Sequence, residues 1–273
     1  MNTSDVNHLT YLNGEKLIGD DFTPEQIEEW YKDETEAYAD LGSNDRTNYN
    51  YDYDYVNQSY GFKYLDQNKK YRVLGFGSAY GDEFKPILHL IESLTIIEPS
   101  LQLRSTMIGN IAPKYISPNV DGTINFPNES FDLIVCYDAI HHVANVSYVF
   151  GEFHRVLAKE GIIMLREPII SMSDWSVPRP GMTKRERGIP HWFFKKLIQK
   201  HNLKIVHLAY YSCMNSLFQR KFGKLFKRGL FAYPIYVNID KMLSKIFKFN
   251  TRYNATNMLQ RISPQSVYYT LKK

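Results

Sequence analysis

Short runs of apolar, β-forming residues alternate with segments of helical periodicity through the middle of the chain. The alternation predicts a parallel sheet covered by helices on both faces, because each helix returns the chain to the same end of the sheet. Right-handed crossovers then gather the carboxyl ends of the strands on one edge, where such folds bind ligands. The predicted strands are 71–76, 94–98, 131–137, 161–167 and 204–211, with a weaker one at 114–118, and the predicted helices are about 82–92, 146–158 and 190–201.

An N-terminal segment precedes this alternation. Residues 1–66 are expected to form a cap with a helix at 23–40, where Thr23 suits the N-cap and Pro24 the first helical position. A tyrosine-rich stretch follows at 48–60, and it either packs on the flank of the domain or closes over a bound ligand.

Residues 67–273 are the predicted main domain. It ends in a strand at 266–271, and a helical insert at about 213–262 stands before that strand. The insert has two amphipathic patterns, with apolar residues on one side of each helix and Lys or Arg on the other.

Charge is distributed unevenly between these two ends. Residues 1–66 hold 15 Asp or Glu against 4 Lys or Arg, whereas residues 220–261 hold ten Lys or Arg and the single acid Asp240. The basic end suits an acidic partner such as a phosphate, a nucleic acid or an anionic membrane surface. The alternative is that the two ends neutralise each other in the fold.

Composition excludes several classes of protein. The chain has 273 residues, 44% of them hydrophobic, which is enough for one large domain with an appended cap. Two cysteines, Cys136 and Cys213, are too few for a disulfide framework or a metal cluster. No apolar run approaches the roughly 20 residues of a membrane-spanning helix, and the N-terminus lacks the pattern of a signal peptide. A cytoplasmic location is therefore expected.

A glycine-rich turn follows the first predicted strand, in "YRVLGFGSAYGDEF". Its glycines are Gly75, Gly77 and Gly81, so the third comes one position too late for the GxGxxG pattern of dinucleotide sites. Glu98 ends the next strand, where a carboxylate can accept hydrogen bonds from ribose hydroxyls. Such an acid is found in nicotinamide sites and in S-adenosylmethionine sites, so these two features leave both cofactors open.

The segment "NVDGTINFPNESFDLIVCYDAIHHV", residues 119–143, decides between the two cofactors. Its FP-x-x-SFD element, apolar run and HHV end resemble the fourth-strand motif of class I S-adenosylmethionine-dependent methyltransferases, above all the type 11/12 group. The glycine loop and "LAKEGIIMLREP" are similar to other motifs of that family, and the resemblance spans about 71–211 and the last strand. It implies a Rossmann-like, seven-stranded sheet whose last strand is antiparallel.

The resemblance also implies a set of residues that contact S-adenosylmethionine. Gly75 and Gly77 would let the backbone approach the methionine part, and Gly81 would allow close packing of the following helix. Glu98 would hold the ribose, and Tyr137 would lie near the sulfonium, where cation–π attraction is available. The full set of predicted cofactor contacts is Gly75, Gly77, Gly81, Glu98, Asp121, Gly122 and Tyr137, with Asp121 and Gly122 at the adenine.

Two residues are candidates for catalysis. Methyl transfer to a hydroxyl requires a base for its proton, and histidine titrates in the suitable range. His142 is the predicted base, with Glu167 as a base or a substrate contact, whereas His141 is expected to serve the structure of the loop. Adjacent histidines also suggest a metal, but no third ligand lies at a recognisable spacing, so no metal is expected.

The predicted activity is methyl transfer to a small-molecule or glycan acceptor, most concretely a sugar hydroxyl. A weaker likeness to methyltransferases of surface-polysaccharide synthesis suggests a nucleotide- or lipid-linked acceptor, peripheral contact with the inner membrane face through the basic insert, and no nucleic acid. Two alternatives remain: a catalytically silent scaffold of the same fold, and a nicotinamide-dependent oxidoreductase. The latter predicts a pyrophosphate on the glycine loop, whereas the methyltransferase predicts an antiparallel last strand.

Overall fold

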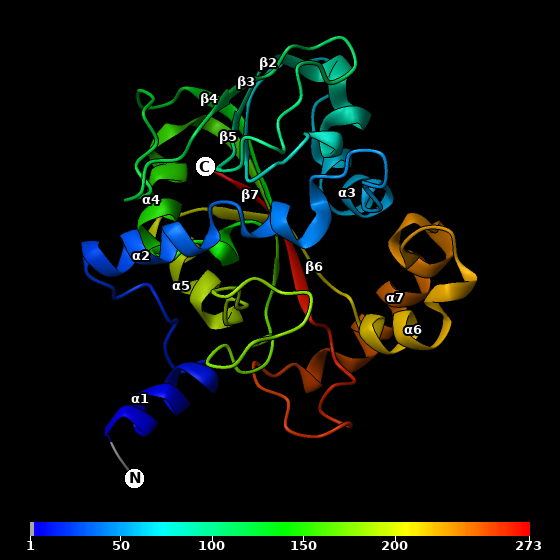
Figure 1. The fold of residues 1–273 in the computed structure, drawn as a ribbon. Helices are drawn as coiled ribbons and strands as arrows, with labels where there is room; N and C mark the ends of the chain where they lie inside the picture. Colours follow the sequence, from blue (N-terminus) through cyan, green and yellow to red (C-terminus); the bar gives the residue numbers. More distant parts are fainter. Residues whose placement is uncertain (1–2) are drawn as a thin grey trace.

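The protein is built on one seven-stranded sheet, shown in Figure 1. The computed structural model describes residues 3–273, leaving aside the side chains of residues 3–7, 216, 217, 220 and 224. The strand order is β3-β2-β1-β4-β5-β7-β6, and β7 runs antiparallel to both of its neighbours. This confirms the predicted fold, antiparallel last strand included. The strands are β1 Tyr71–Phe76, β2 Ile91–Ile97, β3 Lys114–Ile116, β4 Phe131–Tyr137, β5 Leu157–Pro168, β6 Lys204–Tyr211 and β7 Ser266–Lys272.

Helices cover both faces of the sheet. On one face α4 and α5 pack through residues such as Phe150 and Phe194. On the other, α3, the 3-10 segment η3 and α7 contribute Tyr60, Phe84 and Val237. The α-helices are α1 Thr3–Leu12, α2 Pro24–Glu34, α3 Asp54–Tyr60, α4 Val146–Val156, α5 His191–Lys200, α6 Asn215–Phe222 and α7 Pro234–Phe247. The shorter segments are the π-helical η1 Ala39–Ser43 and the 3-10 segments η2 Phe62–Tyr64, η3 Asp82–Leu90, η4 Ile140–His142, η5 Gly223–Leu225, η6 Leu230–Ala232 and η7 Lys248–Asn250.

The segment after the glycine loop differs from its prediction. Residues 82–90 form a 3-10 helix with Pro86 inside it, and β2 already begins at Ile91. Proline has no N–H to donate and disfavours the α region for the residue before it, which explains why a regular α-helix does not form here.

The N-terminal segment starts as the sequence indicates. Thr23 and Gln26 form a capping box at α2, since the Thr23 side chain accepts from the Gln26 N–H and the Gln26 side chain accepts from the Thr23 N–H. The α-helix ends at Glu34, short of residue 40. Val56 and Phe62 belong to the core that covers the sheet, so packing is continuous across residue 66, and the division of the chain there stays a prediction.

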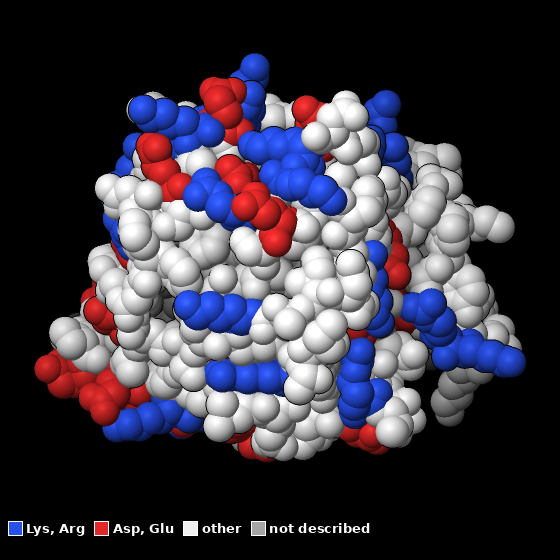
Figure 2. Space-filling view, turned by 90° about the horizontal axis from the view of Figure 1, so that it is seen from above, with Lys and Arg blue, Asp and Glu red and all other residues white. Residues whose placement is uncertain are grey.

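Charged side chains of both signs meet in several places, and Figure 2 shows them intermixed on the face seen from above. Asp52 of the acidic segment accepts from the Arg228 Nε of the basic insert at 2.8 Å. Asp33 likewise pairs with Lys184 and Arg185. Part of the charge asymmetry is therefore neutralised within the fold. Among the described residues, no helix is long and apolar enough to cross a membrane.

Candidate active site

A cavity of about 770 Å³ lies at the carboxyl edge of the sheet, within the size range of small-molecule sites. The ends of β1, β2, β4 and β5 form its floor. Residues from α2, from the tyrosine-rich segment and from 253–266 complete its walls. Chain segments far apart in the sequence thus meet around one space, at the edge where the strand pattern predicts a ligand.

The glycine loop forms one wall through Gly77 and Ala79. Both have positive φ, 64° at Gly77 and 43° at Ala79, and the Gly77 N–H donates to the Ile97 carbonyl at 2.8 Å. A Cβ at Gly77 would lie 2.4 Å from the Cβ of Ala139, so only glycine allows this turn beside the end of β4. Of the three predicted glycines, Gly77 is the one that lines the cavity.

Gly75 and Gly81 have packing roles in this structure. A Cβ at Gly75 would lie 2.6 Å from the Ser78 Oγ, and one at Gly81 would lie 2.2 Å from the Ile108 side chain. Gly81 also has a φ of 74° at the start of η3, in keeping with the close packing predicted for it. Neither residue lines the cavity, so their contact with a cofactor stays a prediction.

Glu98 follows β2 and lines the cavity beside the loop. Its Oε2 accepts the Ala79 N–H at 2.9 Å and its Oε1 accepts the Ser100 N–H at 3.1 Å. Burial raises the pKa of this carboxyl to about 7, against the opposing effect of the two N–H donors. Each oxygen keeps a further lone pair, which is what a ribose diol requires.

The predicted adenine residues separate in the structure. Gly122 lines the cavity, together with the apolar side chains of Ile97 and Ile124. Asp121 does not line it, and its carboxylate instead accepts from the N–H and hydroxyl of Thr123, each at 2.9 Å. The placement favours Gly122 over the Asp121 side chain as the adenine contact.

Tyr137 ends β4 and lines the cavity, but a cation of the chain already lies against its ring, and its predicted contact with the sulfonium stays a prediction. The Arg166 Cζ is 4.8 Å from the centre of that ring and 3.9 Å from that of Tyr53. Asp138 holds the guanidinium, accepting from Nε at 3.1 Å and from Nη2 at 2.7 Å. The Tyr137 hydroxyl is hydrogen-bonded to that of Tyr268. Tyr137 therefore belongs to a buried aromatic and cationic cluster at the cavity floor.

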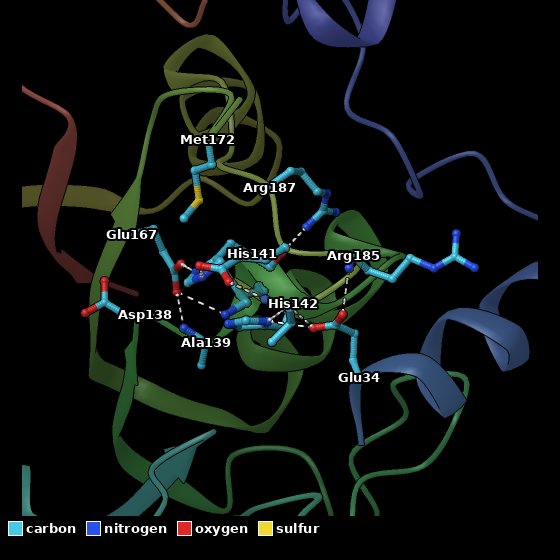
Figure 3. A network of polar contacts seen from close by, with 12 residues as sticks. Glu34, Asp138, Ala139, His141, His142, Glu167, Met172, Arg185 and Arg187 are labelled. Atoms are coloured by element: carbon cyan, nitrogen blue, oxygen red, sulfur yellow. Dashed lines mark hydrogen bonds and ion pairs between the residues drawn. The ribbon is translucent and has the colours of Figure 1, made fainter. Parts of the chain in front are cut away.

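Glu167 holds the loop after β4 in place. Its Oε1 accepts the N–H groups of Ala139 and Ile140, both at 3.0 Å, and its Oε2 lies 2.6 Å from the His141 Nδ1 (Figure 3). The side chain is fully buried and does not line the cavity. Its predicted role as a base or substrate contact is untested, and these contacts favour a positioning role.

His141 stands between two carboxylates. Its Nδ1 is bonded to Glu167, and its Nε2 lies 3.7 Å from the Glu186 Oε1. Burial alone would lower the pKa of His141, but the two carboxylates outweigh it and raise that pKa to about 10. For Glu186 the directions are reversed. Burial alone would raise its pKa, but the hydrogen bond and positive charge of His141 outweigh burial and lower that pKa to about 2. His141 is thus a fixed imidazolium at neutral pH, in line with a structural role.

His142 has a different environment, although it is the next residue. Both histidines line the cavity, but the His142 Nδ1 lies 2.8 Å from the Oε2 of Glu34 (Figure 3). The same oxygen accepts the Thr183 hydroxyl at 2.7 Å, and Glu34 Oε1 accepts the Arg185 N–H at 2.8 Å. A carboxylate that fixes Nδ1 leaves Nε2 as the nitrogen that can take a proton, the arrangement of an oriented general base.

Nothing in the local sequence points to Glu34 or Glu186. Glu34 lies 108 residues before His142, and Glu186 lies in the loop after β5. In the same loop as Glu186, Arg187 is fully buried. It donates to the carbonyls of Ile18 and Val143, and so ties the N-terminal segment to the histidine loop. The predicted helix at 23–40 supplies a second contact besides Glu34, since the Trp30 Nε1–H donates to the His142 carbonyl at 2.6 Å.

One group of described residues has the composition of a metal site. Possible ligand atoms of His141, His142 and Glu186 lie within 4.8 Å of one another. His141 already directs both ring nitrogens at carboxylates, so a cation would have to displace the proton that it carries. The hydrogen bonds account for the cluster, and the absence of a metal stays a prediction.

Comparison with known proteins agrees with the geometry. Residues 74–165, which carry the glycine loop, Glu98 and the histidine pair, match the family model described as a methyltransferase domain. The chain contains a methyltransferase domain. The match agrees with the expected class I methyltransferase, and the free lone pairs of Glu98 and the bare backbone at Gly77 suit the expected cofactor, S-adenosylmethionine. No curated protein matches the sequence.

Solved structures show the same fold at low sequence identity. An S-adenosylmethionine-dependent methyltransferase from Mesorhizobium loti has a TM-score of 0.51 and 13% identity, over 77% of this chain and 94% of that chain. The complex between the Haloferax volcanii Trm112 methyltransferase activator and its methyltransferase has a TM-score of 0.54 and 11% identity, over 90% of this chain and 96% of that one.

Proposed function

We propose that the protein transfers a methyl group from S-adenosylmethionine to a hydroxyl of a small-molecule or glycan acceptor, most concretely a sugar hydroxyl. The observation that carries this proposal is the His142–Glu34 pair at 2.8 Å on the wall of the cavity. An oxygen acceptor loses a proton when it is methylated, so a fixed base beside the methyl group is the machinery that O-methylation needs.

The cavity residues have separate roles in the proposed methyl transfer. Glu98 and the backbone at Gly77 hold the cofactor, which when bound supplies a methyl group activated by a sulfonium. Methylation of a hydroxyl oxygen would release its proton, and His142 Nε2 would take that proton. Glu34 stabilises the imidazolium that results. His141 cannot take this proton, because its pKa of about 10 leaves it already protonated.

The shape and lining of the cavity support a small acceptor. Tyrosines 31, 38, 49, 51 and 53 line it, and their rings offer apolar faces with a polar edge, which suits the faces and hydroxyls of a sugar ring. The cavity continues past the cofactor wall to His142 and Met172, so space remains for an acceptor. This disfavours a silent scaffold, and the antiparallel β7 disfavours an oxidoreductase.

A nucleotide- or lipid-linked sugar is the acceptor class that we favour, with the enzyme in the cytoplasm at the inner membrane face. Support comes from the basic, amphipathic segment around α6 and α7, whose chain continues into the cavity wall at 253–266.

Cofactor binding is the first test. In calorimetric or thermal-shift titrations, S-adenosylmethionine and S-adenosylhomocysteine should bind and NAD should not, with about 2.7 kcal/mol of stabilisation at 100 Kd. Glu98→Ala should abolish this shift, whereas Glu92→Ala, an exposed glutamate on the same strand, should leave it unchanged. An unchanged shift in Glu98→Ala would contradict the site.

The acceptor class needs a separate experiment. The enzyme is incubated with methyl-labelled S-adenosylmethionine and, in parallel, with nucleotide sugars, lipid-linked saccharides, amines and RNA. We expect label on a saccharide oxygen, stable to hydrolysis that removes methyl esters. Label transferred to an amine or to RNA instead would overturn the proposed acceptor.

A further inference from the structure

The outward side of α7 is apolar and is not covered by the rest of the chain. Ile235, Ile239, Met242 and Ile246 follow one another at spacings of four, three and four residues, which places them on one helical face. Their side chains are 44–76% exposed. The opposite side of the helix, with Val237 and Ser244, is buried. This helix therefore packs on the protein through one side and leaves the apolar opposite side exposed.

The exposed apolar surface continues past the end of α7. Phe249 follows Ile246 by three residues and is 85% exposed. The Asn250 Nδ2 donates to the Leu259 carbonyl at 2.8 Å, which brings the loop with Met258 and Leu259 against this end of the helix. Both of these side chains are more than two-thirds exposed. We call Ile235, Ile239, Met242, Ile246, Phe249, Met258 and Leu259 the apolar strip.

The charges beside the strip are all positive. Lys241 and Lys245 are exposed along one flank of it, as a rotation of 100° per residue requires. The one acid between residues 220 and 261, Asp240, is buried, and its carboxylate accepts the N–H groups of Ser212 and Cys213 at 2.8 and 2.7 Å. In Figure 1, α6 and α7 stand at one side of the molecule, away from α1. The outer surface thus combines apolar and cationic groups without a counter-charge from its own segment.

We propose that the apolar strip and its lysines bind the surface of an anionic lipid membrane, with α7 lying in the interfacial plane. Apolar side chains then enter the boundary between headgroups and acyl chains, while the lysines meet the negative headgroups. Charge complementarity favours lipid over a second copy of the chain. In a pair of α7 helices the flanking lysines would face like charges, with no acid to oppose them.

The same surface adjoins the cavity. Arg261 is exposed, lines the cavity, and follows Leu259 by two residues. An acceptor anchored in the same membrane would therefore reach the cavity at the rim nearest the lipid. This consequence rests on the proposed function, whereas the membrane contact itself does not.

Vesicle sedimentation of the full chain tests the proposal. Vesicles of phosphatidylcholine with phosphatidylglycerol should bind the protein, vesicles of phosphatidylcholine alone should bind it weakly, and added salt should release it. Lys241→Gln with Lys245→Gln should weaken binding roughly 30-fold, at about a fivefold loss for each lysine near the surface. Ile239→Gln with Ile246→Gln should weaken it by more than about tenfold.

Matched controls separate this surface from general charge and apolarity. Lys196→Gln with Lys200→Gln removes two exposed lysines at the same spacing from α5, and Leu101→Gln removes an exposed apolar residue elsewhere. Both should leave vesicle binding unchanged. Equal loss in the controls, or no wild-type binding to anionic vesicles, would overturn the proposal. A second outcome would also overturn it: the wild type forms a dimer, measured by light scattering, and Ile239→Gln with Ile246→Gln dissociates this dimer. Calorimetry with S-adenosylmethionine on each variant reports separately on the proposed function.

Discussion

The two halves of the cavity are built in different ways. The cofactor half comes from one continuous part of the chain, in which Gly77, Glu98 and Gly122 stand on consecutive turns at the sheet edge. The acceptor half is assembled from distant segments, as the contact between Glu34 and His142 illustrates. In the proposed function, the first half binds S-adenosylmethionine through backbone and one carboxylate. The second half is held together by ion pairs and hydrogen bonds between segments, so its shape can change without disturbing the first.

The sharpest test of this division is a change that stops methyl transfer and leaves the cofactor bound. With the acceptor identified by the labelling screen, His142→Gln should lower kcat by roughly 10²–10⁴-fold, because an amide at this position cannot take the proton. Glu34→Gln should lower kcat by about tenfold or more, since an amide no longer stabilises the imidazolium.

The affinity for S-adenosylmethionine should stay constant in both variants, as measured by calorimetry. His89→Gln, an exposed histidine away from the cavity, serves as the control and should keep full kcat. If His142→Gln methylated at the wild-type rate, His142 would not be the base, and the acceptor half would act by positioning alone.

A second test acts on the cofactor half through the backbone. Gly77→Ala should destabilise the protein by about 1–3 kcal/mol and prevent cofactor binding, because the new methyl group meets Ala139 in a turn of positive φ. Gly42→Ala is the matched variant, with a φ of 95° but nothing within 4 Å of the added Cβ. It should cost about 1–2 kcal/mol from backbone strain alone. Urea unfolding and calorimetry measure the two effects, and equal losses would show that the close approach to Ala139 is unimportant.

The smallest effect concerns pH. Burial raises the pKa of Glu98 to about 7, and hydroxyl donors from a bound ribose favour the ionised carboxylate, so the pKa should fall on binding. Binding then releases a proton, and the affinity should decrease as the pH falls below 7, by up to about tenfold per pH unit. Calorimetry in buffers of different ionisation enthalpy measures the released proton. Glu98→Gln should bind more weakly at every pH and lose this dependence, and a pH-independent wild type would remove Glu98 from the ribose site.

The same contrast explains what could be predicted from the sequence. Strand and helix periodicity, the glycine turn and the acid after β2 are local patterns, so the sheet and the place of Gly77 and Glu98 followed from them. The role of Gly75 depends on Phe84 and Ser78, which meet it only in the fold. The helix predicted at 82–92 is a 3-10 segment that ends at Leu90, with Pro86 inside it.

The histidine pair shows the limit most clearly. His141 and His142 are neighbours in a motif and are equivalent by composition. Their difference comes from Glu167 and Glu186 on one side and Glu34 on the other, and these carboxylates lie in three separate segments. The motif predicts different roles for the two histidines, but the carboxylates that give them different environments come from distant segments and follow from the fold alone.

The clasp between residues 18–34 and the histidine loop has an evolutionary consequence. Trp30 and Glu34 reach the loop through an indole and a carboxylate, and the Ile18 carbonyl is joined to it through Arg187. None of the three belongs to the strands that precede Gly77 and Glu98. In a descendant protein, replacement of residues 18–34 would change both the carboxylate partner of His142 and one wall of the cavity. New acceptors would then become accessible, while the residues proposed to bind the nucleoside, Gly77 and Glu98, stay unchanged.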